Sequence, residues 1–230
     1  MNTNTKANNL YLILAAIFIA SLVSCNLIFQ KFFQINIWLP FIGDYSFEQS
    51  VGLLPYPITF LVTDIISEIY GLKKANKVVT AGLIASLFML IVVSAADYVS
   101  ATSWSPVSNE IFSQVFGLSA AAVFASMIAY LFAQYIDVRL FHFWKKLTNG
   151  KHLWLRNNAS TIFSQFIDTF SVLFLLCTFN VIDWERFSIL LLNGFLFKVL
   201  FAAIDTPLFY FFSWYLKKKF NLGDNEEILD

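Results

Sequence analysis

Ionisable side chains interrupt the long apolar stretches of this 230-residue sequence at five places: Asp64, Glu68, Asp168, Lys198 and Asp205. A charged side chain at the centre of a membrane-spanning helix costs roughly 2.5–3.5 kcal/mol even on insertion scales, so it is kept where it faces a bundle interior or a wet cavity. One lysine between carboxylates is tolerated because the opposite charges compensate each other. These residues therefore predict a buried polar cavity on a binding or translocation path.

The residue types indicate which ligands such a cavity could bind. Carboxylates and amides accept hydrogen bonds from the amino and ring N–H groups of a purine-like base, while aromatic rings stack on its faces. A carboxylate could also neutralise an amine on the ligand. This chemistry favours a polar, planar ligand, although an amino acid or a simple cation fits nearly as well. Ion pairs that only hold helices together, without any ligand, are the structural alternative.

The stretch that carries the first two acidic residues begins with two prolines, Pro55 and Pro57. Proline cannot donate a helical hydrogen bond, so we expect an irregular start to this segment. Asp64 and Glu68 are four residues apart and share a helix face. At about 1.5 Å per residue, Asp64 lies roughly 10 Å past Pro57, and Glu68 lies one turn further.

The other charges fall at comparable depths in two later segments. Asp168 lies about 18 Å beyond Arg156, and Lys198 lies about 15 Å from the start of the last apolar segment. We expect Asp64, Asp168 and Lys198 to meet near the bilayer midplane. Asp205, seven residues after Lys198, would join Glu68 in a second layer nearer the cytoplasm.

Six apolar segments could position these residues, because about 20 apolar residues span a bilayer core as a helix. The composition agrees: 58% of the residues are hydrophobic and 13% are charged, against about 45–50% and about 25% in soluble domains. The segments cover approximately residues 10–29, 51–70, 78–96, 115–136, 159–179 and 188–212. The sequence predicts one all-α domain over residues 1–230, a polytopic membrane protein with six transmembrane helices and short tails at about 1–9 and 213–230.

Lysine and arginine are distributed unevenly between the two sets of loops. Twelve lie in the tails and the even-numbered loops, against two, Lys31 and Arg186, in the opposite loops. Because cytoplasmic loops carry the excess of these residues, both chain ends are expected inside, an N-in/C-in topology. Gln134, Asp137 and Arg139 end the fourth segment, and we interpret them as solvated anchors at the cytoplasmic rim.

The sequence argues against several other kinds of site and activity. Cys25 and Cys177 lie in apolar segments without disulfide or metal-ligand spacing, so we interpret them as small apolar residues. The run Leu22-Val23-Ser24-Cys25 looks like a lipoprotein cleavage box, but the apolar stretch continues past it, which favours a retained first helix. The sequence has no Gly-x-x-x-x-Gly-Lys-Ser/Thr loop, so we expect no ATP hydrolysis by this chain. We also expect no cofactor, no metal ion and no nucleic-acid partner.

Two blocks of sequence in combination resemble a known family. The first, within residues 55–71, reads Pro-x-Thr-Phe-x-x-Thr-Asp-x-x-x-Glu-x-Tyr-Gly. The second is Trp154-Leu155-Arg156-Asn157-Asn158-Ala159-Ser160-Thr161, followed by Ser164-Gln165 and Asp168-Thr169; Lys198 with Pro207 is a weaker third block. Together they resemble the queuosine precursor transporter family, also described as a vitamin uptake transporter group, over about residues 25–217. Residues 35–49 match poorly, and we expect a variable external loop there.

This resemblance implies a bacterial inner-membrane importer of 7-deazaguanine bases such as preQ0, preQ1 or queuine, which are salvaged to make queuosine in tRNA. It also places six residues on the binding or translocation path: Asp64, Glu68, Arg156, Gln165, Asp168 and Lys198. Asp205 is added to this set by its intramembrane position. We expect alternating access, with Asp64 and Glu68 reading the base and Lys198 paired to Asp168.

Other functions stay open at this point. An intramembrane aspartyl protease needs two Asp that share a proton, but the Gly-x-Gly-Asp motif of such proteases is absent from the sequence, and we do not expect an enzyme. A structural or substrate-binding subunit of a larger membrane complex is the main alternative. The expected partners are a small nucleobase and the lipid bilayer; the sequence leaves a homo-oligomer or an energising subunit open.

Overall fold

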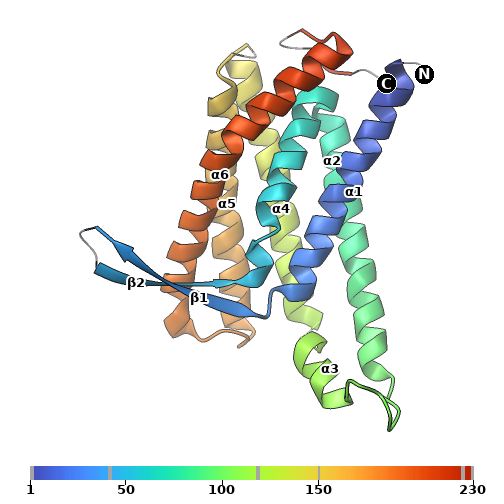
Figure 1. Ribbon diagram of the computed structural model, residues 1–230, viewed down its shortest axis with the longest axis vertical. Coiled ribbons are helices and arrows are strands. Elements are labelled where there is room, and N and C mark those ends of the chain that lie inside the picture. The colour runs from blue at the N-terminus through green and yellow to red at the C-terminus, as the bar shows by residue number, and fades with distance from the viewer. Residues whose placement is uncertain (1–2, 41–42, 118–119, 150, 224–225, 229–230) are drawn as a thin grey trace.

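The computed structural model describes residues 3–40, 43–117, 120–149, 151–223 and 226–228, with their side chains except those of residues 3–4, 39, 120–126 and 156. Its elements are α1 (Thr3–Ile28), β1 (Phe32–Leu39), β2 (Gly43–Ser50), the 3-10 turn η1 (Val51–Leu53), α2 (Tyr56–Tyr98), α3 (Asn109–Phe116), α4 (Ala120–Leu147), α5 (Leu153–Thr178) and α6 (Trp184–Phe220). The long helices form a bundle along one axis (Figure 1). The start of α1 and the end of α6 lie at the same end of that bundle.

The long helix α2 is a helical hairpin rather than a straight rod. Gly71 has φ 79° and ψ 175°, a positive φ that glycine adopts readily because it has no Cβ. The chain reverses direction at this residue, so residues 56–70 and residues 72–98 run in opposite directions (Figure 1). These two legs correspond to the second and third apolar segments of the sequence.

The first leg of α2 forms the centre of the bundle. Residues 59–71 are buried apart from the half-buried Leu61. The buried rings of Phe18 on α1, Phe141 on α4 and Phe209 on α6 belong to the core cluster around it. Because this leg is enclosed on all sides, its polar side chains face other helices and not the surroundings of the protein.

The outer surface of the bundle is apolar, as expected for a protein surrounded by lipid. Among the described residues, four helical segments are long and apolar enough to cross a membrane: Thr5–Ile28, Val51–Tyr98, Leu153–Thr178 and Trp184–Phe220. On α5 the rings of Phe163, Phe166 and Phe170 are exposed, whereas Asp168 on the same helix is buried. Polar groups inside and apolar groups outside are the arrangement that a bilayer requires. The prediction of a helical membrane protein is thereby confirmed.

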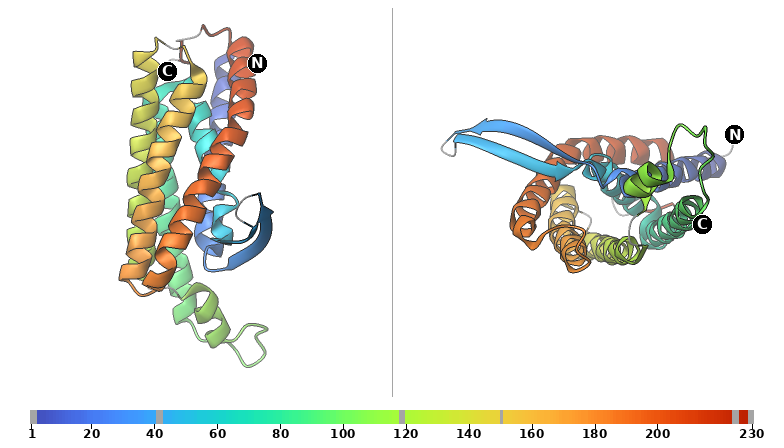
Figure 2. Two further views of the ribbon diagram at one scale, coloured as in Figure 1. Left: turned by 90° about the vertical axis from the view of Figure 1, so that its left-hand side faces the viewer. Right: turned by 90° about the horizontal axis from the view of Figure 1, so that it is seen from below.

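Residues 32–50, where the sequence predicted a loop, form a β-hairpin. Strands β1 and β2 pair antiparallel from Phe32↔Ser50 to Leu39↔Gly43, and the hairpin projects sideways from the bundle (Figure 2). Its base is attached to α6, where Asn193 Nδ2 donates to the Glu48 carbonyl at 3.0 Å. Arg186 pairs with the Glu48 carboxylate at 3.0 Å. Contacts with α6, distant in sequence, therefore hold this segment in place.

Candidate functional site

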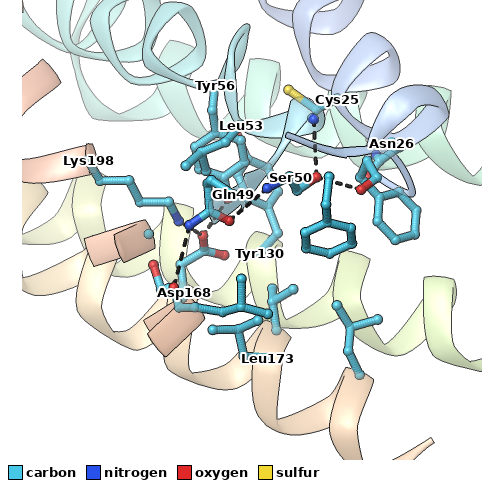
Figure 3. A pocket seen from close by; sticks show the side chains of 18 of the residues that line it. Cys25, Asn26, Gln49, Ser50, Leu53, Tyr56, Tyr130, Asp168, Leu173 and Lys198 are labelled. Carbon is cyan, nitrogen blue, oxygen red and sulfur yellow. Dashed lines mark hydrogen bonds and ion pairs between the residues drawn. The ribbon is translucent and has the colours of Figure 1, made fainter. Parts of the chain in front are cut away.

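A buried ion pair joins α5 and α6 in the interior of the bundle. The Lys198 ammonium lies 2.5 Å from Oδ2 of Asp168, and the two residues are 7% and 1% exposed. Tyr56, the first residue of α2, donates its hydroxyl to the same carboxylate oxygen at 2.5 Å. Its ring lies 4.4 Å from the ammonium, within range of a cation–π interaction. Figure 3 shows the lysine reaching past the tyrosine to the carboxylate.

This arrangement follows from local sequence. Pro57 occupies the first turn of α2, where a missing N–H costs little. The helix therefore begins at Tyr56, directly after the irregular segment that leads into α2. The tyrosine side chain lies beside the middle of α5 and of α6. The predicted contact between Lys198 and Asp168 is present in the structure, and it brings three helices together at one point.

The ion pair bounds a cavity of about 140 Å³. Its walls are mainly apolar and aromatic, and they come from α1, the hairpin, η1 and α2, and from α4, α5 and α6. The lining side chains with polar or reactive groups are Cys25, Asn26, Gln49, Ser50, Tyr56, Tyr130, Asp168, Thr169 and Lys198. An apolar pocket with a few convergent polar groups is the usual form of a small-molecule site.

Two features prepare this cavity for a planar, hydrogen-bonding ligand. The rings of Tyr56 and Tyr130 meet edge to face, with centroids 5.4 Å apart and an interplanar angle of 68°. Within the described part of the chain, Oδ1 of Asp168 has no hydrogen-bond partner. A ligand N–H group could satisfy that oxygen, and the ammonium of Lys198 could donate to a ligand carbonyl.

The hairpin supplies one wall of the cavity through Gln49, which is 6% exposed. Its Oε1 accepts from the backbone N–H of Ser50 at 2.9 Å, and its Nε2 lies 3.4 Å from the Leu190 carbonyl. Gly194 on α6 permits this approach, because a Cβ there would come within 2.9 Å of Gln49 Nε2 and 3.1 Å of Thr169 Cγ2. The segment without a match to the family pattern therefore contributes to the site.

Comparisons with known proteins match the same region of the chain. A family model described as "Putative vitamin uptake transporter" matches residues 50–212, more than two thirds of the sequence. The chain is 29% identical over 127 residues to the probable queuosine precursor transporter of Bacillus subtilis. It is also 29% identical over 130 residues to the queuosine precursor transporter of Escherichia coli. The chain belongs to the family that this model describes, the vitamin uptake transporters.

These alignments span 55% and 56% of both this transporter and its relatives. A third relative, the probable queuosine precursor transporter of Haemophilus influenzae, is 28% identical over 152 residues, which cover 65% of this chain and 62% of the relative. No solved structure matches the chain. Family membership and the long apolar helices identify a multi-pass protein of the bacterial inner membrane. The family model describes transporters, not enzymes.

Two other residues singled out in the sequence of this transporter, Gln165 and Asp205, lie beside the ion pair but outside the main cavity. They line a separate hollow of about 20 Å³, together with Lys198 and the ring of Tyr56. That volume is close to what one water molecule needs, roughly 10–15 Å³. Lys198 and Tyr56 line both spaces, so they lie between the main cavity and this smaller one.

Glu68 lies apart from the cavity, where the two legs of α2 meet. Its carboxylate is 2.5 Å from the ammonium of Lys217 and 3.6 Å from that of Lys145. Lys145 also binds the carboxylate of Glu227 at 2.9 Å. In the structure described here Glu68 thus belongs to a charged cluster at the reversal of α2.

Asp64 is 2% exposed and lines neither cavity. The side chain of Arg156, on α5, lies outside the described residues. The structure therefore joins Asp168 to Lys198, with Gln165 and Asp205 alongside, and it does not place Asp64 or Glu68 at the same cavity.

The interpretation of Gln134 and Asp137 as solvated anchors is wrong, because both are 0% exposed. The reason is the length of α4, which continues to Leu147 and so carries these residues inside the bundle. Tyr56, Tyr130 and Gln49 are cavity residues that the sequence analysis did not single out. Only Tyr56 had a usable signal, since it stands between the two prolines of the matching block.

Proposed function

We propose that this transporter imports queuosine precursors, 7-deazaguanine bases such as preQ0, preQ1 or queuine, across the inner membrane for queuosine salvage in tRNA. The names of its relatives support this substrate class. The observation that carries the proposal is the buried pair of Lys198 and Asp168 at the wall of an aromatic cavity. A purely structural ion pair would need no such space beside it.

A 7-deazaguanine base offers an amino group, ring N–H groups and a carbonyl around a flat bicyclic ring. In the proposed complex, Asp168 accepts from an N–H group and Lys198 donates to the carbonyl, while the rings of Tyr56 and Tyr130 pack against the flat base. The cavity of about 140 Å³ is near the roughly 150 Å³ that accommodates benzene in an engineered protein. A bicyclic base therefore requires some opening, as alternating access provides.

In this proposal, a second layer of polar residues lines the path from the cavity toward the cytoplasm. Gln165 and Asp205 line the small hollow next to Lys198, and Glu68 lies further along at the reversal of α2. Asp64 lies one turn before Glu68 on α2, and Arg156 lies in the first turn of α5. We assign all five to translocation, and Asp168 and Lys198 to binding of the base.

The proposal includes six membrane passages with both ends in the cytoplasm. Counting the two legs of α2 separately gives six long helices, the others being α1, α4, α5 and α6. The shared end of the bundle for the start of α1 and the end of α6 supports an even number of passages (Figure 1). The excess of Lys and Arg at that end supports the orientation.

Uptake of labelled preQ1 tests this function. A bacterial strain that cannot make the base and lacks its own transporter is supplied with wild-type protein, Asp168→Asn, or Asp183→Asn as an exposed control. We expect uptake and tRNA queuosine with the wild type and the control, and a loss of both with Asp168→Asn at equal protein level. Equal uptake with and without the wild-type protein would reject the proposal. Uptake by the purified chain in vesicles distinguishes a stand-alone carrier from a subunit of a larger complex.

A further inference from the structure

Asp137 on α4 is a buried carboxylate that the proposed base-binding site does not use. It is 0% exposed, and the Ser164 hydroxyl on α5 donates to its Oδ1 at 2.8 Å. The Ser160 hydroxyl, one turn earlier, also hydrogen-bonds to it. In the described part of the chain, its Oδ2 has no hydrogen-bond partner and no Lys or Arg forms an ion pair with it.

This environment differs from that of the other buried acidic groups. Asp168 has Lys198 as a partner, and Glu68 has Lys217 and Lys145. An isolated ionised carboxylate in a medium of low dielectric is so unfavourable that the group takes up a proton instead. Hydroxyl groups stabilise a carboxylate without supplying a positive charge, so Asp137 is suited to gain and lose a proton. Intramembrane carboxylates of this kind mark proton relays in pumps and transporters.

One face of α4 carries polar side chains from Asp137 toward the cavity. Tyr130, Gln134 and Asp137 share one buried face of α4 because they are spaced four and three residues apart. Gln134 donates through Nε2 to the Tyr130 hydroxyl at 2.6 Å. Tyr130 lines the cavity and contacts the ring of Tyr56, which donates to Asp168. Asp137 therefore lies about two turns from a residue of the base-binding wall, on the same face of α4.

Among the described residues, α5 and α2 make the most extensive contacts with α4, and α6 reaches it through the ring of Phe209, which contacts Phe141. On α5, the polar groups that reach Asp137 are those of Ser160 and Ser164, and the side chain of Arg156 lies outside the described residues. The charged groups on the first leg of α2 are Asp64 and Glu68, both acidic. Of these two, Glu68 is itself paired with Lys145 and Lys217.

We propose that Asp137 is the coupling-proton site of this transporter. In the outward-facing state its carboxylate takes one proton from external water; in the inward-facing state the carboxylic acid returns that proton to the cytoplasm. The base and the proton move in the same direction, so the proton gradient drives accumulation of the base. This inference rests on the proposed import function and adds its energy source.

Purified full-length protein in vesicles separates coupling from transport itself. Accumulation of labelled preQ1 is measured under an inward proton gradient, and exchange of labelled for unlabelled preQ1 is measured without a gradient. With Asp137→Asn we expect gradient-driven accumulation to fall to the level of protein-free vesicles while exchange persists. The exposed control Asp183→Asn should retain both activities.

Three results would overturn the inference while leaving import intact: gradient-driven accumulation undiminished in Asp137→Asn, wild-type accumulation indifferent to the proton gradient, or a sodium gradient replacing it at constant pH. A wild type without exchange or accumulation would instead reject the proposed function, and the inference with it. If Asp137→Asn does not fold, Ser164→Ala takes its place. The pH profile of preQ1 accumulation by Ser164→Ala must then be shifted from that of the wild type. An unchanged profile counts against the proposal.

Discussion

Two clusters of buried charge in this transporter are built differently. At the cavity, one lysine, Lys198, faces one carboxylate, Asp168, with a tyrosine hydroxyl as the additional donor. At the reversal of α2, one carboxylate, Glu68, faces two lysines, Lys145 and Lys217, and no described cavity adjoins them. The first cluster keeps one oxygen available to a ligand, whereas the second surrounds its carboxylate with protein. An intramembrane acid can therefore bind an organic ligand only when space lies beside it.

Besides the translocation role proposed for Glu68, the second cluster stabilises the break in α2. The positive φ of Gly71 interrupts the helical hydrogen bonds, and the backbone N–H of Ile228 donates to the Ile69 carbonyl at 2.8 Å. A carbonyl at a helix end needs such an external partner. Glu227 binds Lys145 next to it. The C-terminal segment therefore fastens the reversal of α2 to α4 and to Glu68.

The largest expected effect comes from Lys198→Met, which leaves Asp168 as an uncompensated buried charge. Breaking a buried ion pair in this way costs about 3–5 kcal/mol, so we expect loss of preQ1 uptake and a clear drop in unfolding temperature in detergent. The double variant Lys198→Met/Asp168→Asn should recover most of the stability but no uptake.

Lys217→Met is the matched change at the other cluster. Because Lys145 stays beside Glu68, its loss of stability should be smaller than that of Lys198→Met. If Lys217→Met and Lys198→Met lost equal stability, the distinction between a binding pair and a structural pair would not hold. The same conclusion would follow if the double variant Lys198→Met/Asp168→Asn recovered uptake.

Tyr56→Phe tests the binding cluster more gently, because it removes one hydroxyl and keeps the ring. A hydrogen bond to a charged group contributes about 1.5–3 kcal/mol, so we expect preQ1 affinity to fall by about 10- to 100-fold. Equilibrium binding to the purified protein gives the value. An unchanged affinity would exclude this hydroxyl from the binding state, and Tyr135→Phe on α4, outside both cavities, provides the control.

Gly71→Ala tests the structural cluster. An alanine at positive φ is strained, at a cost above about 1 kcal/mol, and its Cβ would overlap the Glu227 carboxylate. We expect a lower unfolding temperature with the affinity for preQ1 retained in the folded fraction. Adding Glu227→Ala should relieve the overlap but not the backbone strain, so the recovery should be partial. A large change in affinity would show that the two clusters are coupled.

The smallest effect is expected for Glu227→Gln, because its carboxylate is 31% exposed. Partly solvated ion pairs contribute about 0–1 kcal/mol. We expect a small decrease in unfolding temperature that disappears at high salt. A loss as large as that of Lys217→Met would mean that the C-terminal segment, and not the lysines, holds the reversal of α2.

The sequence was sufficient to predict those features of the fold and the site that follow from the physics of the bilayer. Apolar length predicted the long helices, and the cost of buried charge predicted that Lys198 and Asp168 would pair. It also predicted the irregular entry at Pro55 and Pro57, since proline geometry is local. The reversal of α2 falls between two predicted segments, at the glycine that ends the matching block.

The features that the sequence did not predict depend on contacts between residues distant in the chain. The hairpin is fastened by side chains of α6, so its own sequence did not reveal it. Gln134 and Asp137 were misplaced because the end of α4 could not be fixed from hydrophobicity where charged and apolar residues mix. Tyr130 is one aromatic residue among many, and only its position beside Tyr56 distinguishes it.

Equilibrium binding of labelled preQ1 to the purified transporter tests the central claim most directly. Wild type, Asp168→Asn and Lys217→Met are compared after each is shown to be folded. The account predicts that Asp168→Asn abolishes measurable binding while Lys217→Met binds like the wild type. Wild-type affinity in Asp168→Asn would contradict it.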